Sequence, residues 1–409
     1  MNIILITSYF LPEINSSAQI YYDLAVNFSK HGHRVDIVTS YPRDYNRLSN
    51  DKSRVPLDEE IYKNVFVHRV IHFSKRDSKI FRGLEHFLVV LYYYNRIVRL
   101  VRELPYKLDV GIIYIAPLPL YYLARLIKIF HKIPIILNIE EFHPQELTDV
   151  GFLKNNLIIG ILKFIERRAC TKAEYISVHS PGGVDYLIER GAKKDKIEVT
   201  FNSFDLGVID SASVTDDFKQ EYNLEGKYLI SYGGLFSPFQ GIDHILDVAI
   251  RVKHDADLVF FIAGDGMLRS HLEERIKNEK INNVILSPFL QREKYLSLVK
   301  SSDISLVLLD ARMKSPVLPG KLAGLMGLKR PIIGLVNPDC ETANIIKIAN
   351  CGLIIHPQDI NGFENAIYYL KNNPNQCNIF GDNGREYVVN HMTSEIVVNT
   401  YEKIFQKLL

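Results

Sequence analysis

Apolar runs of strand length alternate with amphipathic segments of helix length along most of the chain. Residues 2–9 form a continuous apolar run, and residues 17–31 then carry apolar side chains at helical spacing before the next run at 34–39. Continuous apolar strands joined by amphipathic helices are typical of a parallel sheet with both faces covered. Further strands of this domain are expected at 65–70, 110–115 and 133–139.

The same alternation starts again in the second half of the chain. Five strands are expected there, at 227–233, 258–264, 283–286, 304–309 and 331–335. A chain of 409 residues is also too long for one hydrophobic core. We therefore expect an α/β protein with two doubly wound, Rossmann-like domains, residues 1–203 and 227–384, facing a central cleft. The polar residues 204–226 would be the linker, and a helix over 385–409 could pack back on the first domain.

Composition and charge narrow the class of protein. Hydrophobic residues make up 47% and charged residues 23%, which is ordinary for a globular protein, and the net charge of +2 argues against a dedicated nucleic-acid binder. The four cysteines have no close spacing, so we expect reduced thiols and no metal site. The longest uncharged stretch, 110–124, contains two prolines and is shorter than the roughly 20 residues of a spanning helix. These features, with no signal-peptide pattern, predict a cytoplasmic protein.

Two glycine-containing loops follow expected strands of the second domain. Gly233 and Gly234 end one strand, and Gly264, Asp265 and Gly266 end the next and precede a helix. Backbone N–H groups that converge before a helix bind anions such as phosphate. The alternative is that these glycines only form turns and caps.

Lys321 is the expected cation of this anion site. It follows Pro319 and Gly320 at the start of a predicted helix, where an ammonium group would lie beside backbone donors. The alternative interpretation is a solvated surface lysine. Phe289 and Glu341 lie near the ends of other expected strands and complete the predicted nucleotide site.

The order and spacing of several motifs resemble the retaining glycosyltransferases of family 4, which have the GT-B fold. The similarity is strongest to the bacterial branch that makes O-antigen, capsule and exopolysaccharide. The motifs are SYFLPEI, HGHRVDIVTSYP, SYGGLFSPFQGIDHILDVA, FFIAGDGMLRSHLEE and PGKLAGLMGLKRPIIG, with others between them over nearly the whole chain. The resemblance implies transfer of a sugar from a nucleotide-sugar, with a UDP-sugar favoured, to a polyprenyl-linked or oligosaccharide acceptor. It also implies retention of the anomeric configuration, with the leaving phosphate as base and no metal or other cofactor.

The sequence departs from this family at the donor site. Family members commonly have an Arg and a Lys where this chain has Leu235 and Gln240, and two glutamates where it has Pro316 and Gly324. The second glutamate holds the donor ribose in the family. Glu341 and Thr342 could instead contact sugar hydroxyls, although a glutamate there could equally serve the helix dipole.

Candidate acceptor-side residues follow the expected strand that ends at 139. Asn138 matches a position at which the family often has a histidine, and Glu141 matches an aspartate of the resembling branch. A carboxylate here could take the proton of the acceptor hydroxyl or orient the acceptor. His143 is the third candidate, with a purely structural role as the alternative.

Residues 63–107 combine positive charge with aromatic side chains. This segment holds ten Lys/Arg and three Asp/Glu, and it contains Arg96, Arg99 and Arg102 at a spacing of three. Apolar residues at helical spacing in the same segment are Leu84, Phe87, Leu88, Leu91 and Val98. Such a helix could lie on an anionic membrane surface, or it could present a core face and a solvated basic face. The membrane interpretation predicts peripheral attachment to the inner face of the cytoplasmic membrane.

Two other functions remain open at this stage. A nucleotide-sugar epimerase has a similar fold, but the sequence offers no convincing set of carboxylates and histidines for it. A non-catalytic partner subunit of a glycosyltransferase complex would explain the missing ribose glutamate and phosphate arginine.

Overall fold

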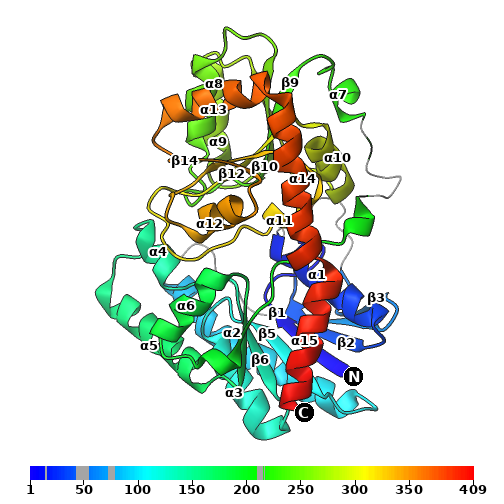
Figure 1. The fold of residues 1–409 in the computed structure, drawn as a ribbon. Helices are drawn as coiled ribbons and strands as arrows, with labels where there is room; N and C mark the ends of the chain where they lie inside the picture. The colour runs from blue at the N-terminus through cyan, green and yellow to red at the C-terminus, as the bar shows by residue number, and fades with distance from the viewer. Residues whose placement is uncertain (14–15, 43–54, 72–78, 210–214, 216) are drawn as a thin grey trace. The chain divides into compact units, whose positions relative to one another are not determined.

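The computed structural model describes residues 1–13, 16–42, 55–71, 79–209, 215 and 217–409. The chain divides into two compact units, whose elements are labelled in Figure 1. Unit 1 consists of Met1–Gln145, Leu153–Ser203 and Ser394–Leu409, and unit 2 of Glu146–Phe152 and Phe204–Thr393. Each unit is built around its own sheet with helices between successive strands, so the predicted class of two doubly wound α/β domains is confirmed.

Unit 1 contains an eight-stranded sheet in the order β3-β4-β2-β1-β5-β6-β7-β8. Every described pair is parallel except β3 with β4. The strands are β1 (Asn2–Thr7), β2 (Arg34–Ser40), β3 (Asp58–Tyr62), β4 (Val65–Val70), β5 (Val110–Tyr114), β6 (Ile135–Ile139), β7 (Tyr175–Val178) and β8 (Ile197–Val199). Its helices are α1 (Ser16–Lys30), α2 (Lys79–Glu103), α3 (Leu120–His131), α5 (Asn156–Lys172), α6 (Pro181–Glu189) and α15 (Ser394–Leu408).

The last helix of the chain belongs to the core of unit 1. Tyr401 and Phe405 of α15 are buried, and both rings lie 5.7 Å from the ring of Phe28 on α1. Helix α15, red in Figure 1, thus covers apolar surface that α1 and the first strands cannot bury by themselves.

Unit 2 contains a six-stranded sheet in the order β11-β10-β9-β12-β13-β14, parallel throughout its described pairs. The strands are β9 (Tyr228–Leu235), β10 (Leu258–Asp265), β11 (Val284–Ser287), β12 (Ile304–Leu308), β13 (Ile332–Leu335) and β14 (Gly352–Ile355). Its helices are α7 (Phe218–Glu221), α8 (Asp243–Arg251), α9 (Arg269–Asn278), α10 (Arg292–Ser301), α11 (Leu322–Gly327), α12 (Glu341–Ile348), α13 (Ile360–Asn372) and α14 (Pro374–His391). The short helix α4 (Gln145–Asp149) falls almost entirely within the segment of unit 2 that interrupts unit 1.

The strand order indicates where each unit is expected to bind a ligand. In unit 2 the order reverses between β9 and β12, and in unit 1 between β1 and β5. Ligands of open α/β sheets bind outside the carboxyl ends of the strands at such a reversal. Gly233 and Gly234, close to the carboxyl end of β9, therefore lie at the expected position in unit 2.

Two segments differ from the sequence-based boundaries. The described part of residues 204–226 belongs to unit 2, where Phe218 is buried, while residues 210–214 and 216 lie outside the described residues. Residue 385 lies inside α14, and the chain returns to unit 1 only at Ser394.

Three of the apolar residues at helical spacing in α2 are exposed, so they do not form the face that packs on the sheet. Phe87, Leu88 and Leu91 are each more than 40% exposed, whereas Tyr93 and Ile97 are fully buried. The segment is apolar on more than one side, so its period alone does not indicate which side meets the sheet. The predicted membrane segment also includes residues 72–78, which lie outside the described residues, and Leu84, whose side chain does as well.

Candidate functional site

A buried polar network surrounds the carboxyl end of β6 in unit 1. The Asn138 amide nitrogen lies 2.8 Å from the Tyr21 hydroxyl, which donates in turn to Oε1 of Glu140. His179, just after β7, places Nε2 3.0 Å from Oδ1 of Asn138 and 3.3 Å from Oε1 of Glu140. Three elements far apart in sequence thus converge on one carboxylate.

The partners fix the direction of these hydrogen bonds. Both neighbours of His179 Nε2 are acceptors, so this nitrogen carries a proton. The other ring nitrogen, Nδ1, is buried and has no hydrogen-bond partner among the described residues. Burial, followed by the Glu140 carboxylate, raises the pKa of Tyr21 well above its usual value, so Tyr21 acts as a donor to Glu140.

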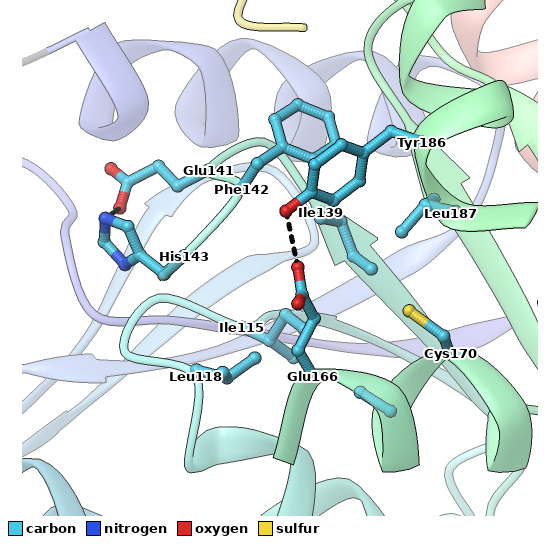
Figure 2. Close-up of a pocket in the computed structure, with 11 residues that line it drawn as sticks. Ile115, Leu118, Ile139, Glu141, Phe142, His143, Glu166, Cys170, Tyr186 and Leu187 are labelled. Atoms are coloured by element: carbon cyan, nitrogen blue, oxygen red, sulfur yellow. Dashed lines mark hydrogen bonds and ion pairs between the residues drawn. The ribbon is translucent and has the colours of Figure 1, made fainter. Parts of the chain in front are cut away.

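Glu141 and His143 point toward one another at the rim of a small pocket (Figure 2). Glu141 Oε2 lies 3.4 Å from Nε2 of His143, and their side chains are 38% and 25% exposed. A partly exposed carboxylate beside an imidazole can accept a proton from a bound hydroxyl. These two predicted residues are therefore adjacent and reachable, whereas Asn138 is 1% exposed and is engaged with its neighbours.

The floor of the same pocket carries a second carboxylate, Glu166 of α5, which is structurally engaged. Tyr186 of α6 donates to it at 2.7 Å, as Figure 2 shows, and the Arg190 guanidinium lies 3.2 Å away. The Arg190 guanidinium also lies 3.2 Å over the Tyr186 ring. Burial raises the pKa of Glu166, against the opposing effects of Tyr186 and Arg190. This group anchors α5 to α6.

The expected glycine loops of unit 2 are mostly strand: Gly233 and Gly234 lie inside β9 and Gly264 inside β10, and the ends of these two strands are side by side. Gly234 pairs with Gly264 across the parallel strands β9 and β10, and the Phe236 N–H then donates to the Asp265 carbonyl at 2.8 Å. A Cβ at Gly264 would collide with the Gly234 carbonyl oxygen and the Phe236 ring. Close backbone approach therefore explains why glycine occupies position 264.

The Lys321 side chain contacts the backbone near the end of β9. Its Nζ donates to the Gly233 carbonyl at 3.1 Å and lies 3.9 Å from the centre of the Tyr232 ring. Lys321 forms no ion pair with any carboxylate in the described part of the chain, and burial lowers the pKa of its ammonium group to about 7. A half-buried cation without a counter-ion, beside the glycines of a strand end, is suited to an anionic ligand.

The other predicted nucleotide contacts differ in accessibility. Asp265 is exposed, and its side chain accepts from the Gly266 N–H at 2.7 Å; Phe289 is half-buried after β11. Glu341 is 8% exposed at the start of α12. Thr342 is fully buried and donates to the Val317 carbonyl at 2.8 Å, so its hydroxyl is used within the fold.

The structure also shows the surroundings of the residues that differ from the resembling family. Leu235 is 54% exposed at the end of β9, and Gln240 accepts from the Tyr232 hydroxyl at 3.5 Å. Gly324 is buried in α11, where an added Cβ would lie 3.2 Å from the Phe204 ring. The position of the usual ribose glutamate thus faces an aromatic ring in unit 2.

Neither a metal cluster nor a spanning helix is found in the described residues. No group of three or more His, Cys, Asp or Glu side chains there is placed to hold a metal ion. No described helix is both long enough and apolar enough to cross a bilayer.

Sequence reasoning missed Tyr21, Glu140 and His179. Glu140 stands beside Glu141 in the sequence, but only the fold shows that it is the one surrounded by buried donors. Tyr21 and His179 lie 119 and 39 residues from Glu140, counted from the sequence numbers, and no local pattern joins them. The polar residue directly after a buried strand was the one available signal for His179.

Two family models match the chain, one in each half. The model described as Glycosyltransferase Family 4 matches residues 18–208, and that described as Glycosyl transferases group 1 matches residues 214–387. Together they cover most of both units.

Curated relatives of the chain are distant. A putative colanic acid biosynthesis glycosyl transferase of Escherichia coli K12 is 21% identical over 47% of this chain and 49% of its own length. The N-acetylgalactosamine-N,N'-diacetylbacillosaminyl-diphospho-undecaprenol 4-alpha-N-acetylgalactosaminyltransferase of Campylobacter jejuni is 26% identical over 40% and 42%. The chain therefore matches less than half of the length of either relative.

Among solved structures, Anabaena HepE in complex with UDP-glucose is similar over the full length of both chains. The TM-score is 0.71 and the sequence identity is 12%, so the likeness concerns the fold.

Proposed function

Because the chain belongs to the group 1/family 4 glycosyltransferases, we propose that unit 2 binds a nucleotide-sugar and that unit 1 binds the acceptor of the sugar. The observation that supports this proposal is the ammonium group of Lys321, which is unpaired in the described part of the chain. It has no described carboxylate partner and lies against Gly233, beside the paired ends of β9 and β10. A diphosphate would supply the missing counter-charge.

In this proposal Lys321 and the glycines near the ends of β9 and β10 hold the diphosphate of the donor. Leu235 and Gln240 carry no charge, so we assign to Lys321 the stabilisation of the leaving group as negative charge develops on it. A UDP-sugar is the favoured donor, supported by the similarity to a protein crystallised with UDP-glucose. The nucleotide-sugar is a substrate, and we propose that transfer uses no metal.

On the acceptor side, Glu141 is the carboxylate that can reach a bound hydroxyl, with His143 beside it. Asn138 acts as a positioning residue through Tyr21 and Glu140. We further propose that the anomeric configuration is retained and that the acceptor is polyprenyl-linked or an oligosaccharide of surface polysaccharide synthesis. The names of the colanic acid and diphospho-undecaprenol relatives support this class of acceptor.

Nucleotide binding tests the donor half of the proposal. Thermal unfolding is measured with UDP, GDP and their common sugar conjugates, because a ligand that binds the folded state raises the melting temperature. We expect a UDP conjugate to stabilise the protein, and Lys321→Ala to weaken its affinity by about 1.5–3 kcal/mol, the size of a charge-assisted hydrogen bond. Lys329→Ala is the control, since Lys329 is paired with Asp382 on the surface. Unchanged affinity in Lys321→Ala would contradict the assignment.

A non-catalytic partner subunit is the second candidate, favoured by Gly324 and Leu235 where the family has a ribose and a phosphate contact. Slow hydrolysis of the bound nucleotide-sugar separates the two. An enzyme should release free sugar from the donor without any partner, and should do so equally in EDTA. A chain that binds the donor but never hydrolyses it would be the subunit.

We also propose that residues 63–107 dock on an anionic membrane at the cytoplasmic face. Arg99 and Arg102 are exposed on α2 and support this, whereas Arg96 pairs with Asp58 and Glu103 and is only 17% exposed. Each Lys or Arg near such a surface contributes about 1 kcal/mol, and salt screens the attraction. Vesicle co-sedimentation should therefore weaken with salt and with Arg99→Gln/Arg102→Gln. If the wild-type protein does not co-sediment with anionic vesicles at low salt, this proposal is contradicted.

A further inference from the structure

Helix α5 exposes an apolar stripe on the face opposite to its buried side. Leu157 is 75% exposed, Ile161 46% and Phe164 56%, and their spacing places them on one face of the helix. Figure 1 shows α5 at the edge of unit 1. An isolated exposed leucine needs no explanation, but three large apolar side chains in line indicate an interaction surface.

The orientation of α5 is fixed, so this stripe cannot turn inward. Ile165, Ala169 and Cys170 are buried against unit 1, and Glu166 is held by Tyr186 and Arg190. Asn155 also caps the N-terminus of the helix, because its side chain accepts hydrogen bonds from the N–H groups of the second and third residues after it. The stripe therefore exists before any partner binds.

The charges around the stripe are all of one sign. Five basic residues lie in or just before α5, and all are exposed: Lys154, Lys163, Arg167, Arg168 and Lys172. None of them forms an ion pair with a carboxylate of the described residues, and Glu166, the single acidic residue between 150 and 173, is buried. The Arg168 guanidinium lies 5.1 Å from the Phe164 ring, so apolar and cationic groups are interleaved.

We propose that this α5 face inserts into the interfacial region of an anionic lipid bilayer. The stripe would enter the boundary between headgroups and acyl chains, and the unpaired Lys and Arg side chains would reach lipid phosphates. The choice of lipid over a protein partner rests on the cations, because the core of a protein interface is depleted in charge and lysine is disfavoured there. The surface is separate from residues 63–107, and its assignment does not depend on glycosyl transfer.

The absence of tryptophan from the chain permits a direct test. Phe164→Trp introduces a single fluorophore into the stripe, and Tyr369→Trp places the control on α13 of unit 2, where the native side chain is 47% exposed. We expect vesicles containing phosphatidylglycerol to shift the Phe164→Trp emission to shorter wavelength, and brominated acyl chains to quench it. The Tyr369→Trp control should do neither.

Stripe variants then test the energetic contribution of the surface. Leu157→Ser/Ile161→Ser should weaken vesicle binding at least about tenfold. Insertion of the variant would no longer transfer the two apolar side chains from water into the bilayer, so their favourable transfer free energy is lost. Ile379→Ser, which changes a 49% exposed residue of α14, should leave binding unchanged. Both sites are exposed, so unfolding temperatures should match the wild type.

Three outcomes would overturn the proposal. Phe164→Trp emission that is unaffected by anionic vesicles at low salt would show that the stripe does not meet lipid. An equal shift in the Tyr369→Trp control would show adsorption without a specific face. A shift that grows with protein concentration in the absence of lipid, together with a dimer in sedimentation, would show that a second copy of the chain covers the stripe.

Discussion

At the residue scale, Lys321 links the donor site to pH. Burial lowers the pKa of its ammonium group to about 7, whereas the usual value is 10.5. The unfolded chain therefore holds this proton up to higher pH than the folded protein does. Between these two values the unfolded state binds more protons, so the contribution of Lys321 makes the ligand-free protein more stable as pH rises.

Donor binding should show the opposite dependence on pH. A diphosphate favours the charged lysine, so binding above pH 7 must be accompanied by proton uptake. We expect the affinity for a nucleotide-sugar, whose own phosphates do not titrate in this range, to fall by up to roughly tenfold per pH unit above 7. Calorimetry in buffers of different ionisation enthalpy measures the proton uptake. Lys321→Gln should remove both the slope and the uptake, and a slope that persists in this variant would contradict the assignment.

Glu140 and Glu141 are neighbours in sequence but should differ in what their substitution changes. Glu141 is partly exposed, so Glu141→Gln should lower kcat by about 10²–10⁴ and leave thermal stability and donor affinity unchanged. Glu140 is surrounded by buried donors, so Glu140→Gln should cost about 1–3 kcal/mol of unfolding free energy. Kinetics and urea unfolding of both variants check this. A stability loss confined to Glu141→Gln would reverse the two roles.

At the scale of elements, we expect replacement of glycine by alanine to have opposite effects on stability at two positions. Gly264→Ala should destabilise unit 2 and abolish donor binding, since its Cβ would collide with the Gly234 carbonyl and the Phe236 ring. Gly160→Ala in α5 should instead stabilise by about 0.5–1 kcal/mol, because nothing lies within 4 Å of the new Cβ and alanine is the better helix former. Denaturant unfolding of the two variants measures both effects. A Gly264→Ala protein with normal donor affinity would show that the ends of β9 and β10 can separate without loss of donor binding.

At the scale of the whole molecule, the chain ends in the unit where it began. Phe405 of α15 is fully buried and packs on Phe28, so Phe405→Ala should cost about 3–5 kcal/mol of unfolding free energy. Lys403→Ala is a suitable control on the exposed side of the same helix. The loss should appear in the unfolding of unit 1, with the donor affinity of unit 2 retained. An unchanged melting temperature would mean that α15 does not complete the core.

The sequence by itself determined the two α/β halves and the strands that lie inside their sheets. Strands such as β1 and β10 are buried on both faces, and their continuous apolar runs indicate strands of this kind. It also indicated that glycines lie close to the carboxyl ends of β9 and β10 and that Lys321 is near them, because parallel strands end at one edge of a sheet. The strands β3, β7, β8 and β14 were not predicted.

Only the tertiary structure decided which polar residues are paired and which apolar residues are exposed. The network of Tyr21, Glu140 and His179 joins residues far apart in the chain, and pairing of that kind leaves no local pattern. The exposed stripe of α5 was hidden for a related reason, since a helix that is apolar on two sides does not reveal which side the sheet will cover. A periodic pattern specifies the geometry of an element, whereas burial depends on what packs against it.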